Sequence, residues 1–366
     1  MVIAGLLQVI ATDLNLSVTR AGYLITAYAL GFAFGAPVLG AITGRFCRKQ
    51  VVVVGLLIVA AGSLWGAFIH DAHALVASRM VVAFGASLVI PSVSAIAAFI
   101  AAPVDRPRAL AQVIMGMTLA MVIGVPAGTW LGGQVGWHVT LALAALLATV
   151  AAGAIKWLLP GGINVPPVPF AAWRALLGNW RAHALIASSM LHLMAVFTLF
   201  TYIAPFLYQV GGLQADKLSL MLAWFGVAGL SGNILLSVIG ARIKRDRLFL
   251  AAIILTGCAV FAMNWTHYSI VVAVLAGGLW SLVGNFFVPL QQARMLAFAP
   301  HAGAAILALN ISAVFVGQAL GSLVGGLVSE RFGLDALPFA AAALTLVTLG
   351  YILATRGLIK IPAAAT

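Results

Sequence analysis

Eleven stretches of this chain are each long and apolar enough to cross a lipid bilayer as a helix. Such a helix needs about 20 mostly apolar residues. The stretches that meet this rule lie near residues 19–40, 50–69, 74–97, 108–132, 138–159, 182–207, 217–240, 247–266, 268–290, 302–328 and 336–355. Only 7% of the residues are charged, whereas a soluble domain is about one quarter charged. The sequence therefore predicts an all-α polytopic membrane protein.

One further apolar stretch, residues 1–12, is too short to cross a bilayer before the chain reaches Asp13. It also lacks the basic leading region of a secretory signal peptide. We interpret it as the second half of a first helix whose beginning is missing from this sequence. The expected architecture is eleven full spans plus a partial first helix.

Basic residues orient the predicted spans. If the loop after residues 19–40 is cytoplasmic, only Arg20, Lys217 and Arg331 fall on the opposite side. The residues then placed on the cytoplasmic side are Arg45, Arg48, Lys49, Arg106, Arg108, Lys156, Arg174, Arg181, Arg242, Lys244, Arg245, Arg247, Arg294, Arg356 and Lys360. This bias follows the positive-inside rule, so we expect an inner (plasma) membrane protein with both ends of the intact chain in the cytoplasm. The net charge of +12 forms no basic stripe, so no nucleic acid partner is expected.

A break in the middle of the chain separates two sets of spans. Residues 160–180 read PGGINVPPVPFAAWRALLGNW, whose proline and glycine content ends any membrane helix. We therefore predict an N-terminal helical half at 1–159, a cytoplasmic linker at 160–181 and a C-terminal helical half at 182–366.

Two glycine-rich segments repeat across these halves. GVPAGTWLGG (124–133) and GQALGSLVGG (317–326) share their glycine spacing at an offset of 193 residues. A second pair, AFGAPVLGAITGRFCR (33–48) and LSGNILLSVIGARIKR (230–245), aligns at an offset of 197. Glycines four apart let two helices approach closely, although this pattern alone is a general packing feature. Two matched copies favour a duplicated unit, as in transporters built from parallel repeats.

With these segments the chain resembles the major facilitator superfamily, in particular its twelve-span drug:proton antiporters of the arabinose-efflux-like or purine-efflux-like kind. The loop signature between spans two and three is matched by Gly40, Arg45, Arg48 and Lys49 in GAITGRFCRK. Gly44 stands where the family has an acid, and Cys47 where it has a glycine. The resemblance implies a gating loop at these residues.

The same resemblance concerns transport direction. GVPAGTWLGG is similar to the antiporter signature of span five, carried by Gly124, Pro126, Gly128 and Gly132, and this signature is typical of exporters. The repeat in span eleven adds Gly317, Gly321 and Gly325 as packing residues. The resemblance therefore favours efflux.

Arg79 is the charged residue predicted to lie inside a span, in the family-like segment RMVVAFGAS. A charge at the bilayer centre costs about 2.5–3.5 kcal/mol on insertion scales and usually faces a cavity or a partner. The resemblance implies a cavity arginine that tunes an acid or holds an anionic group; the alternative is an arginine that extends to the nearby interface. All seven carboxylates fall in loops or at span ends. We expect the missing first-helix segment to carry the coupling acid.

Other pathway candidates are polar residues within spans. His192 is titratable near neutral pH and is a candidate proton carrier; a neutral imidazole hydrogen-bonded between helices is the alternative. Tyr28, Asn233 and Asn310 lie in family-like segments and are candidate cavity residues, or equally interhelical hydrogen bonds worth about 0.6 kcal/mol each. Prolines 37, 91, 126, 205 and 289 are expected to kink their spans.

These features predict secondary active efflux of a small organic solute, such as a drug-like amphiphile, a sugar or a nucleobase, in exchange for protons. The alternatives are an uncoupled facilitator or importer of the same fold, and a non-transporting membrane sensor or assembly partner. The sequence carries no phosphate loop, paired carboxylates or nucleophile–base set. We therefore expect no enzymatic activity, cofactor or metal, and a chain that works in the bilayer as a monomer.

Overall fold

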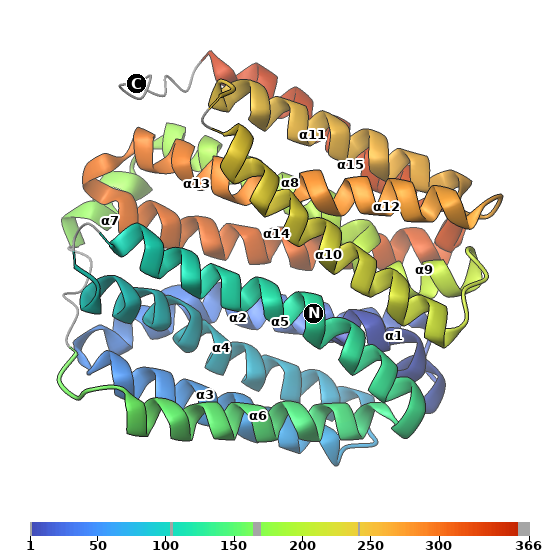
Figure 1. Ribbon diagram of the computed structural model, residues 1–366, viewed down its shortest axis with the longest axis horizontal. Coiled ribbons are helices and arrows are strands. Elements are labelled where there is room, and N and C mark those ends of the chain that lie inside the picture. Colours follow the sequence, from blue (N-terminus) through green and yellow to red (C-terminus); the bar gives the residue numbers. More distant parts are fainter. Residues whose placement is uncertain (1, 103–104, 164–169, 241, 358–366) are drawn as a thin grey trace. The chain divides into compact units, whose positions relative to one another are not determined.

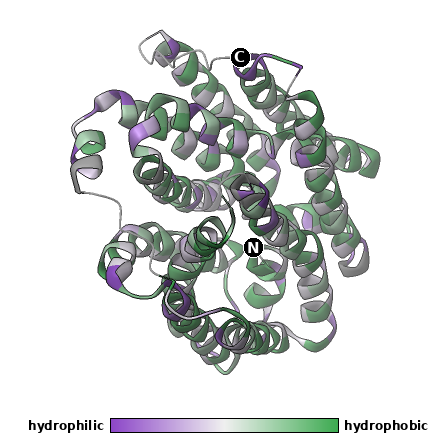
Figure 2. Ribbon diagram, turned by 60° about the vertical axis from the view of Figure 1, so that its left-hand side comes forward, coloured by the Kyte–Doolittle hydropathy of each residue, from purple (hydrophilic) through white to green (hydrophobic). Residues whose placement is uncertain are grey.

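The computed structural model describes residues 2–102, 105–163, 170–240 and 242–357, and its regular structure there is entirely helical (Figure 1). Eleven helical segments of this described part are long and apolar enough to cross a membrane. They coincide with the eleven predicted stretches, so the prediction of eleven spans is confirmed. Figure 2 shows hydrophobic residues along most of each helix.

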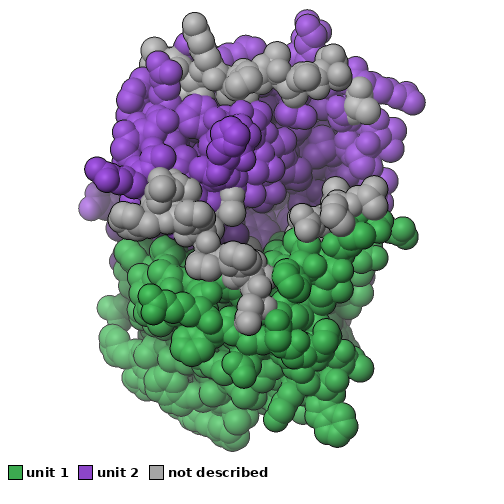
Figure 3. Space-filling model, turned by 90° about the vertical axis from the view of Figure 1, so that its left-hand side faces the viewer, with its two compact units in different colours: residues 1–167 green, residues 168–366 purple. Residues whose placement is uncertain are grey.

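The chain divides into two compact units, Met1–Pro167 and Val168–Thr366 (Figure 3). The helices of the first unit are α1 (Val2–Asp13), α2 (Val18–Ile42), α3 (Arg48–Ala67), α4 (Ala72–Ile100), α5 (Arg106–Val135) and α6 (Trp137–Leu158). Two of these helices are capped by side chains at their N-termini. At the start of α2 the Ser17 side chain accepts a hydrogen bond from the N–H of Arg20, and at the start of α4 the Asp71 side chain accepts one from the N–H of Ala74. The short helix α1 is buried in the core of this unit, where Leu6 and Ile10 pack with Leu24 of α2.

The second unit contains the following helices: α7 (Phe170–Leu177), α8 (Trp180–Phe200), α9 (Ile203–Gln209), α10 (Ala215–Ile239), α11 (Arg245–Ala262), α12 (Ile270–Gly284), α13 (Phe287–Phe298), α14 (Gly303–Phe332) and α15 (Leu337–Arg356). Its core joins α11, α13 and α15 through Phe249, Phe287 and Ile352.

Helix pairing inside one unit repeats inside the other. In the first unit α1 packs on α5, α2 on α4, and α3 on both α4 and α6. In the second unit α8 packs on α14, α10 on α12, and α11 on both α12 and α15. These pairs occupy corresponding places in the chain order. Both units therefore carry the same internal arrangement, as the repeated glycine segments suggest.

Two predicted spans are each divided into two helices. The span at 182–207 breaks between α8 and α9 at Thr201 and Tyr202, and the span at 268–290 breaks between α12 and α13 at Asn285 and Phe286. Proline has no N–H to donate to the carbonyl four residues earlier. Thr201 and Asn285 stand four residues before Pro205 and Pro289, which explains both positions. Pro37, Pro91 and Pro126 lie inside continuous helices.

Candidate functional site

Arg79 lies in the interior of the first unit, on α4, with 5% of its surface exposed. Its Nη2 donates to the carbonyl oxygen of Gly62 on α3 over 3.5 Å, and its Nε donates to Oγ of Ser78 over 3.3 Å. Both acceptors are neutral. The guanidinium is therefore held between α4 and α3 in the interior of the unit.

A pair of glycines on α3 makes room for this guanidinium. A Cβ added at Gly66 would lie 2.6 Å from Nη2 of Arg79 and 2.9 Å from Oγ of Ser78. Gly62, one turn earlier, supplies the accepting carbonyl. This role of Gly62 and Gly66 was not predicted, although their four-residue spacing and lack of side chains are a usable signal for close helix approach.

Tyr28 of α2 is the second predicted pathway residue in this unit. Its phenol and the Arg79 guanidinium interact electrostatically, and its ring packs near Phe32 at a centroid distance of 6.4 Å. The structure thus brings Arg79 and Tyr28 together from α4 and α2. Together with Ser78 and Gly62 they form a small polar site, the Arg79 site, within the apolar interior.

The predicted gating loop between α2 and α3 contacts the segment that follows α6. The backbone N–H of Arg48 donates to the carbonyl oxygen of Ile163 over 3.0 Å. Nζ of Lys49 donates to the carbonyl oxygen of Leu159 over 2.6 Å. Ile163 is itself buried beside Val52 of α3. Gly40 and Arg45 of the same signature are exposed.

Cys47 caps the start of α3 inside this loop. Slight burial acts to raise the pKa of its thiol, but backbone N–H groups act more strongly in the opposite direction. These groups belong to Gln50 and Lys49 of α3 and to Gly162 and Ile163 of the segment after α6. The pKa of the thiol therefore lies below its usual range, because hydrogen bonds to a thiolate favour the charged form.

The two glycine segments form helix contacts at corresponding places. On α5, a Cβ added at Gly128 would lie 2.7 Å from Cγ1 of Val2, and one at Gly132 would meet Leu6 of α1. At Gly124 an added Cβ would meet nothing within 4 Å in the described part of the chain. The packing role predicted for this segment therefore falls on Gly128 and Gly132, next to Pro126 within the continuous α5.

The contacts on α14 are closer. Added Cβ atoms at Gly317, Gly321 and Gly325 would meet the backbone carbonyl oxygens of Met190, Met194 and Thr198 on α8. The three pairs share one register, so the two helices run parallel with their backbones in direct contact. In the first unit the glycines of α5 instead meet side chains of α1.

His192, Asn233 and Asn310 lie on three different helices of the second unit, α8, α10 and α14. No hydrogen bond among the described residues joins them. The His192 ring is buried and stacks on Phe287, with a centroid distance of 3.8 Å and an interplanar angle of 14°. Its Nδ1 and the Oδ1 of Asn310 are buried without a hydrogen-bond partner in the structure as described. Asn233 is half-buried.

A buried polar cluster around Arg294 was not predicted. Arg294 was expected in a cytoplasmic loop, but it lies on α13 with 7% of its surface exposed. Its Nη1 donates to Oε1 of Gln291 over 2.9 Å, and Nε2 of Gln291 donates to Oγ of Ser188 and to the carbonyl oxygen of Leu185, each over 2.8 Å. Asp246 lies 4.0 Å from its Nε. The one signal for this cluster in the sequence is the three-residue spacing of Gln291 and Arg294, which places both on one side of a helix.

Every carboxylate whose exposure the structure describes is exposed: Asp13, Asp71, Asp105, Asp246, Glu330 and Asp335. Within the described residues no group of three or more His, Cys, Asp or Glu is arranged to hold a metal ion. The arginine and histidine side chains that are buried in the described spans are Arg79, His192 and Arg294.

Comparison with known proteins shows the family. The sequence profile of the Major Facilitator Superfamily matches residues 1–312, and the chain belongs to this superfamily of membrane transporters. It is 32% identical to the MFS-type transporter YtbD of Bacillus subtilis, over 90% of this chain and 84% of that protein. It is 28% identical to a probable sugar efflux transporter of Helicobacter pylori, over 94% and 88% of the two chains.

A solved structure shows the same fold. The bacterial homologue of the human lysosomal transporter Spinster, in an inward-facing and unoccupied conformation, superposes with a TM-score of 0.80. The alignment covers 100% of this chain and 95% of that one at 17% identity. At that identity the likeness concerns the fold alone.

Proposed function

We propose that this transporter exports a small organic solute in exchange for protons, by alternating access in the inner membrane. The observation that carries this proposal is the α5–α1 contact. The segment that resembles the exporter signature, residues 124–133, supplies Gly128 and Gly132 to that contact. A segment at this contact can influence how α1 and α5 move together. A signature that is typical of exporters must act on such a movement if it is to influence the direction of transport.

For the solute, the relatives favour a neutral polar molecule such as a sugar. One relative is named a probable sugar efflux transporter. Arg79 and Tyr28 supply donors that suit hydroxyl groups as well as anions. Drug-like amphiphiles and nucleobases are tested beside sugars, because neither Arg79 nor Tyr28 alone selects one of these three solute classes.

For the proton, His192 is the candidate carrier within the described spans, since the described carboxylates are exposed. Its Nδ1 has no hydrogen-bond partner among the described residues, so an imidazolium would need a second conformation that offers water or an acceptor. Alternating access provides such a change. The same observations favour the second candidate function, an uncoupled facilitator, if His192 keeps its packing in every state.

Flux in reconstituted vesicles tests the proposal. The purified chain is incorporated into phospholipid vesicles with an imposed pH gradient, and accumulation of labelled sugars, nucleobases and cationic dyes is measured. We expect gradient-driven accumulation of one solute class that nigericin abolishes. Equilibration without accumulation would support the facilitator instead. No flux of any solute, with a correctly folded chain, would contradict both.

A further inference from the structure

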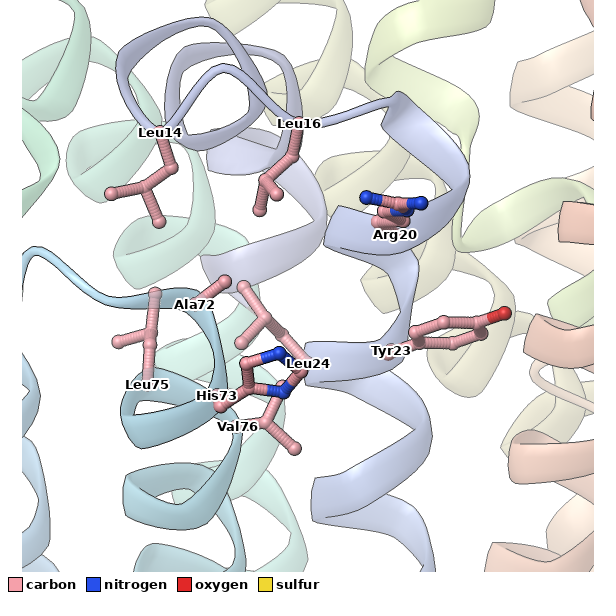
Figure 4. Close-up of a pocket in the computed structure, with 9 residues that line it drawn as sticks. All are labelled: Leu14, Leu16, Arg20, Tyr23, Leu24, Ala72, His73, Leu75 and Val76. Atoms are coloured by element: carbon pink, nitrogen blue, oxygen red, sulfur yellow. The ribbon is translucent and has the colours of Figure 1, made fainter.

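A groove of about 310 Å³ lies in the first unit, where the α1–α2 loop meets the first turns of α2 and α4 (Figure 4). Its walls are apolar and include Leu14 and Leu16 from the loop, Leu24 from α2, and Leu75 and Val76 from α4. Arg20 and His73 are its charged or titratable lining residues. The groove is therefore amphipathic, with apolar walls beside a cation.

The loop that forms one wall has a fixed conformation. Asn15 adopts a left-handed backbone with φ of 52°. The N–H of Leu16 donates to the carbonyl oxygen of Ala11 over 2.8 Å. This is the Schellman arrangement that closes a helix, and it turns the residue after the left-handed one back toward the helix. Leu16 is thus held at the groove by the way α1 ends.

The cation of the groove is not neutralised within the described residues. Arg20 is exposed, and its guanidinium forms no ion pair or hydrogen bond there. The two carboxylates near the ends of α1 and α4 are engaged elsewhere. Oδ2 of Asp13 accepts from Nε1 of Trp137 over 2.9 Å, and Oδ2 of Asp71 accepts from the N–H of Ala74 over 2.8 Å.

The groove also lies at the start of two candidate membrane spans, the level at which a spanning helix meets the lipid headgroups. The spans of α2 and α4 begin at Val18 and Ala72, so Arg20 and His73 are at the start of their spans. Tyr23, 46% exposed on the same groove, is a residue type enriched at membrane–water interfaces. Apolar walls extend from this level into the spans through Leu24 and Val76.

We propose that this groove binds an anionic phospholipid, with the phosphate on Arg20 and part of an acyl chain along the leucine-lined wall. A phosphate ester matches the unpaired guanidinium, which is a strong donor to such anions. The apolar walls match a hydrocarbon chain and would contribute nothing to a free anion. A bound lipid would contact the α1–α2 loop and α4 together.

Binding to purified chain tests this. Delipidated protein in a neutral detergent is titrated with phosphatidylglycerol or phosphatidylcholine of the same chains, and retained lipid is counted by native mass spectrometry. We expect preferential retention of phosphatidylglycerol. Arg20→Gln should weaken it about fivefold, the effect of one basic residue at a membrane surface. Lys217→Gln, which removes an exposed cation from the start of α10, is the matched control and should leave it unchanged.

A second variant separates the two parts of the site. Ala72→Phe adds a ring to the groove lining and should lower retention of both lipids while Arg20 is kept. Equal losses in Arg20→Gln and Lys217→Gln would overturn the proposal in favour of diffuse surface charge. Glycerol phosphate competing at the same concentration as phosphatidylglycerol would overturn it in favour of a free-anion site. Equal retention of the two lipids by the unmodified chain would also overturn it.

Discussion

The guanidinium of Arg294 lies over the ring of Phe249, with its Cζ 4.1 Å from the ring centroid. This contact joins α13 to α11 inside the second unit. The same guanidinium donates to Gln291, which in turn holds Ser188 and Leu185 of α8. One buried side chain therefore connects three helices, although the carboxylate of Asp246 lies 4.0 Å from its Nε.

This geometry predicts that the neutral partners of Arg294 matter more than its ion pair. Arg294→Met should lower the free energy of unfolding by about 1–3 kcal/mol, because it removes a hydrogen bond to a charged donor and the contact with Phe249. Asp246→Asn should cost less than about 1 kcal/mol, because the Asp246 carboxylate is 56% exposed and exposed pairs contribute little. Thermal unfolding in detergent measures both. A loss from Asp246→Asn as large as that from Arg294→Met would contradict this assignment.

The glycines of α14 are predicted to tolerate no side chain. Gly321→Ala would place a methyl group against the carbonyl oxygen of Met194, and overpacking of this kind costs about 1–3 kcal/mol. Gly124→Ala is the matched control, since its methyl group meets nothing within 4 Å among the described residues. The yield of monodisperse protein and its unfolding temperature should fall for the first variant only. Equal yields and equal unfolding temperatures for the two variants would show that α14 and α8 can move apart to accept a methyl group at little cost in stability.

At the Arg79 site, position and charge can be tested separately. Arg79→Gln should lower solute flux about tenfold or more, because ionisable residues inside a membrane mark substrate or ion pathways. Gly66→Ala keeps the charge but displaces the guanidinium, since its methyl group would lie 2.6 Å from Nη2. We expect an intermediate loss. Flux is normalised to folded protein, and Gly116→Ala, where an added Cβ meets nothing within 4 Å among the residues that the structure describes, serves as control. Unchanged solute flux in Arg79→Gln would contradict a role of Arg79 in the transport pathway and would show that it only packs α4 against α3.

His192 carries the prediction for coupling. His192→Gln keeps a polar side chain but cannot titrate near neutral pH, so it should abolish accumulation driven by a pH gradient while solute counterflow stays within about twofold. His183→Gln, at an exposed position on the same helix, is the control and should change neither. Unchanged gradient-driven accumulation in His192→Gln would exclude this residue as the proton carrier. The stacking on Phe287 would then be its role.

The spans were predictable because burial in lipid imposes a long apolar run on each one, and such runs are visible without any knowledge of contacts. The helix contacts of Gly128 and Gly321 were indicated by their repeated spacing. The breaks at Thr201 and Asn285 were not predicted, because Pro205 and Pro289 look the same in the sequence as Pro37, which lies inside a continuous helix.

The candidate sites were less predictable than the spans. Arg79 and Tyr28 were both named, but their proximity depends on how α2 packs on α4. Arg294 was assigned to a loop because the predicted span ended at residue 290, and only packing shows that it is buried. The contact of Lys49 with Leu159 joins residues 110 apart in the chain, and no local pattern encodes it.

Cys47 provides a prediction that tests the loop contact and the orientation of the chain together. The thiolate is the reactive form, and the pKa of Cys47 lies below its usual range. A larger fraction is therefore ionised at neutral pH, and the alkylation rate should rise with pH and level off at a lower pH than for an unstructured cysteine. In inside-out vesicles a membrane-impermeant maleimide should label Cys47. Cys258 should stay unlabelled because it lies within the span Arg245–Trp265.

Lys49→Met sharpens this test. It removes the bond to Leu159, so the N–H groups of Gly162 and Ile163 should be held less closely to the thiol, and alkylation of Cys47 at neutral pH should slow. The backbone N–H groups of residues 49 and 50 still act on the thiol from the start of α3, so the rate should remain above that of an unstructured cysteine. An unchanged rate would show that the segment after α6 does not act on this thiol. Labelling of Cys47 only in right-side-out vesicles would reverse the orientation expected from the positive-inside rule.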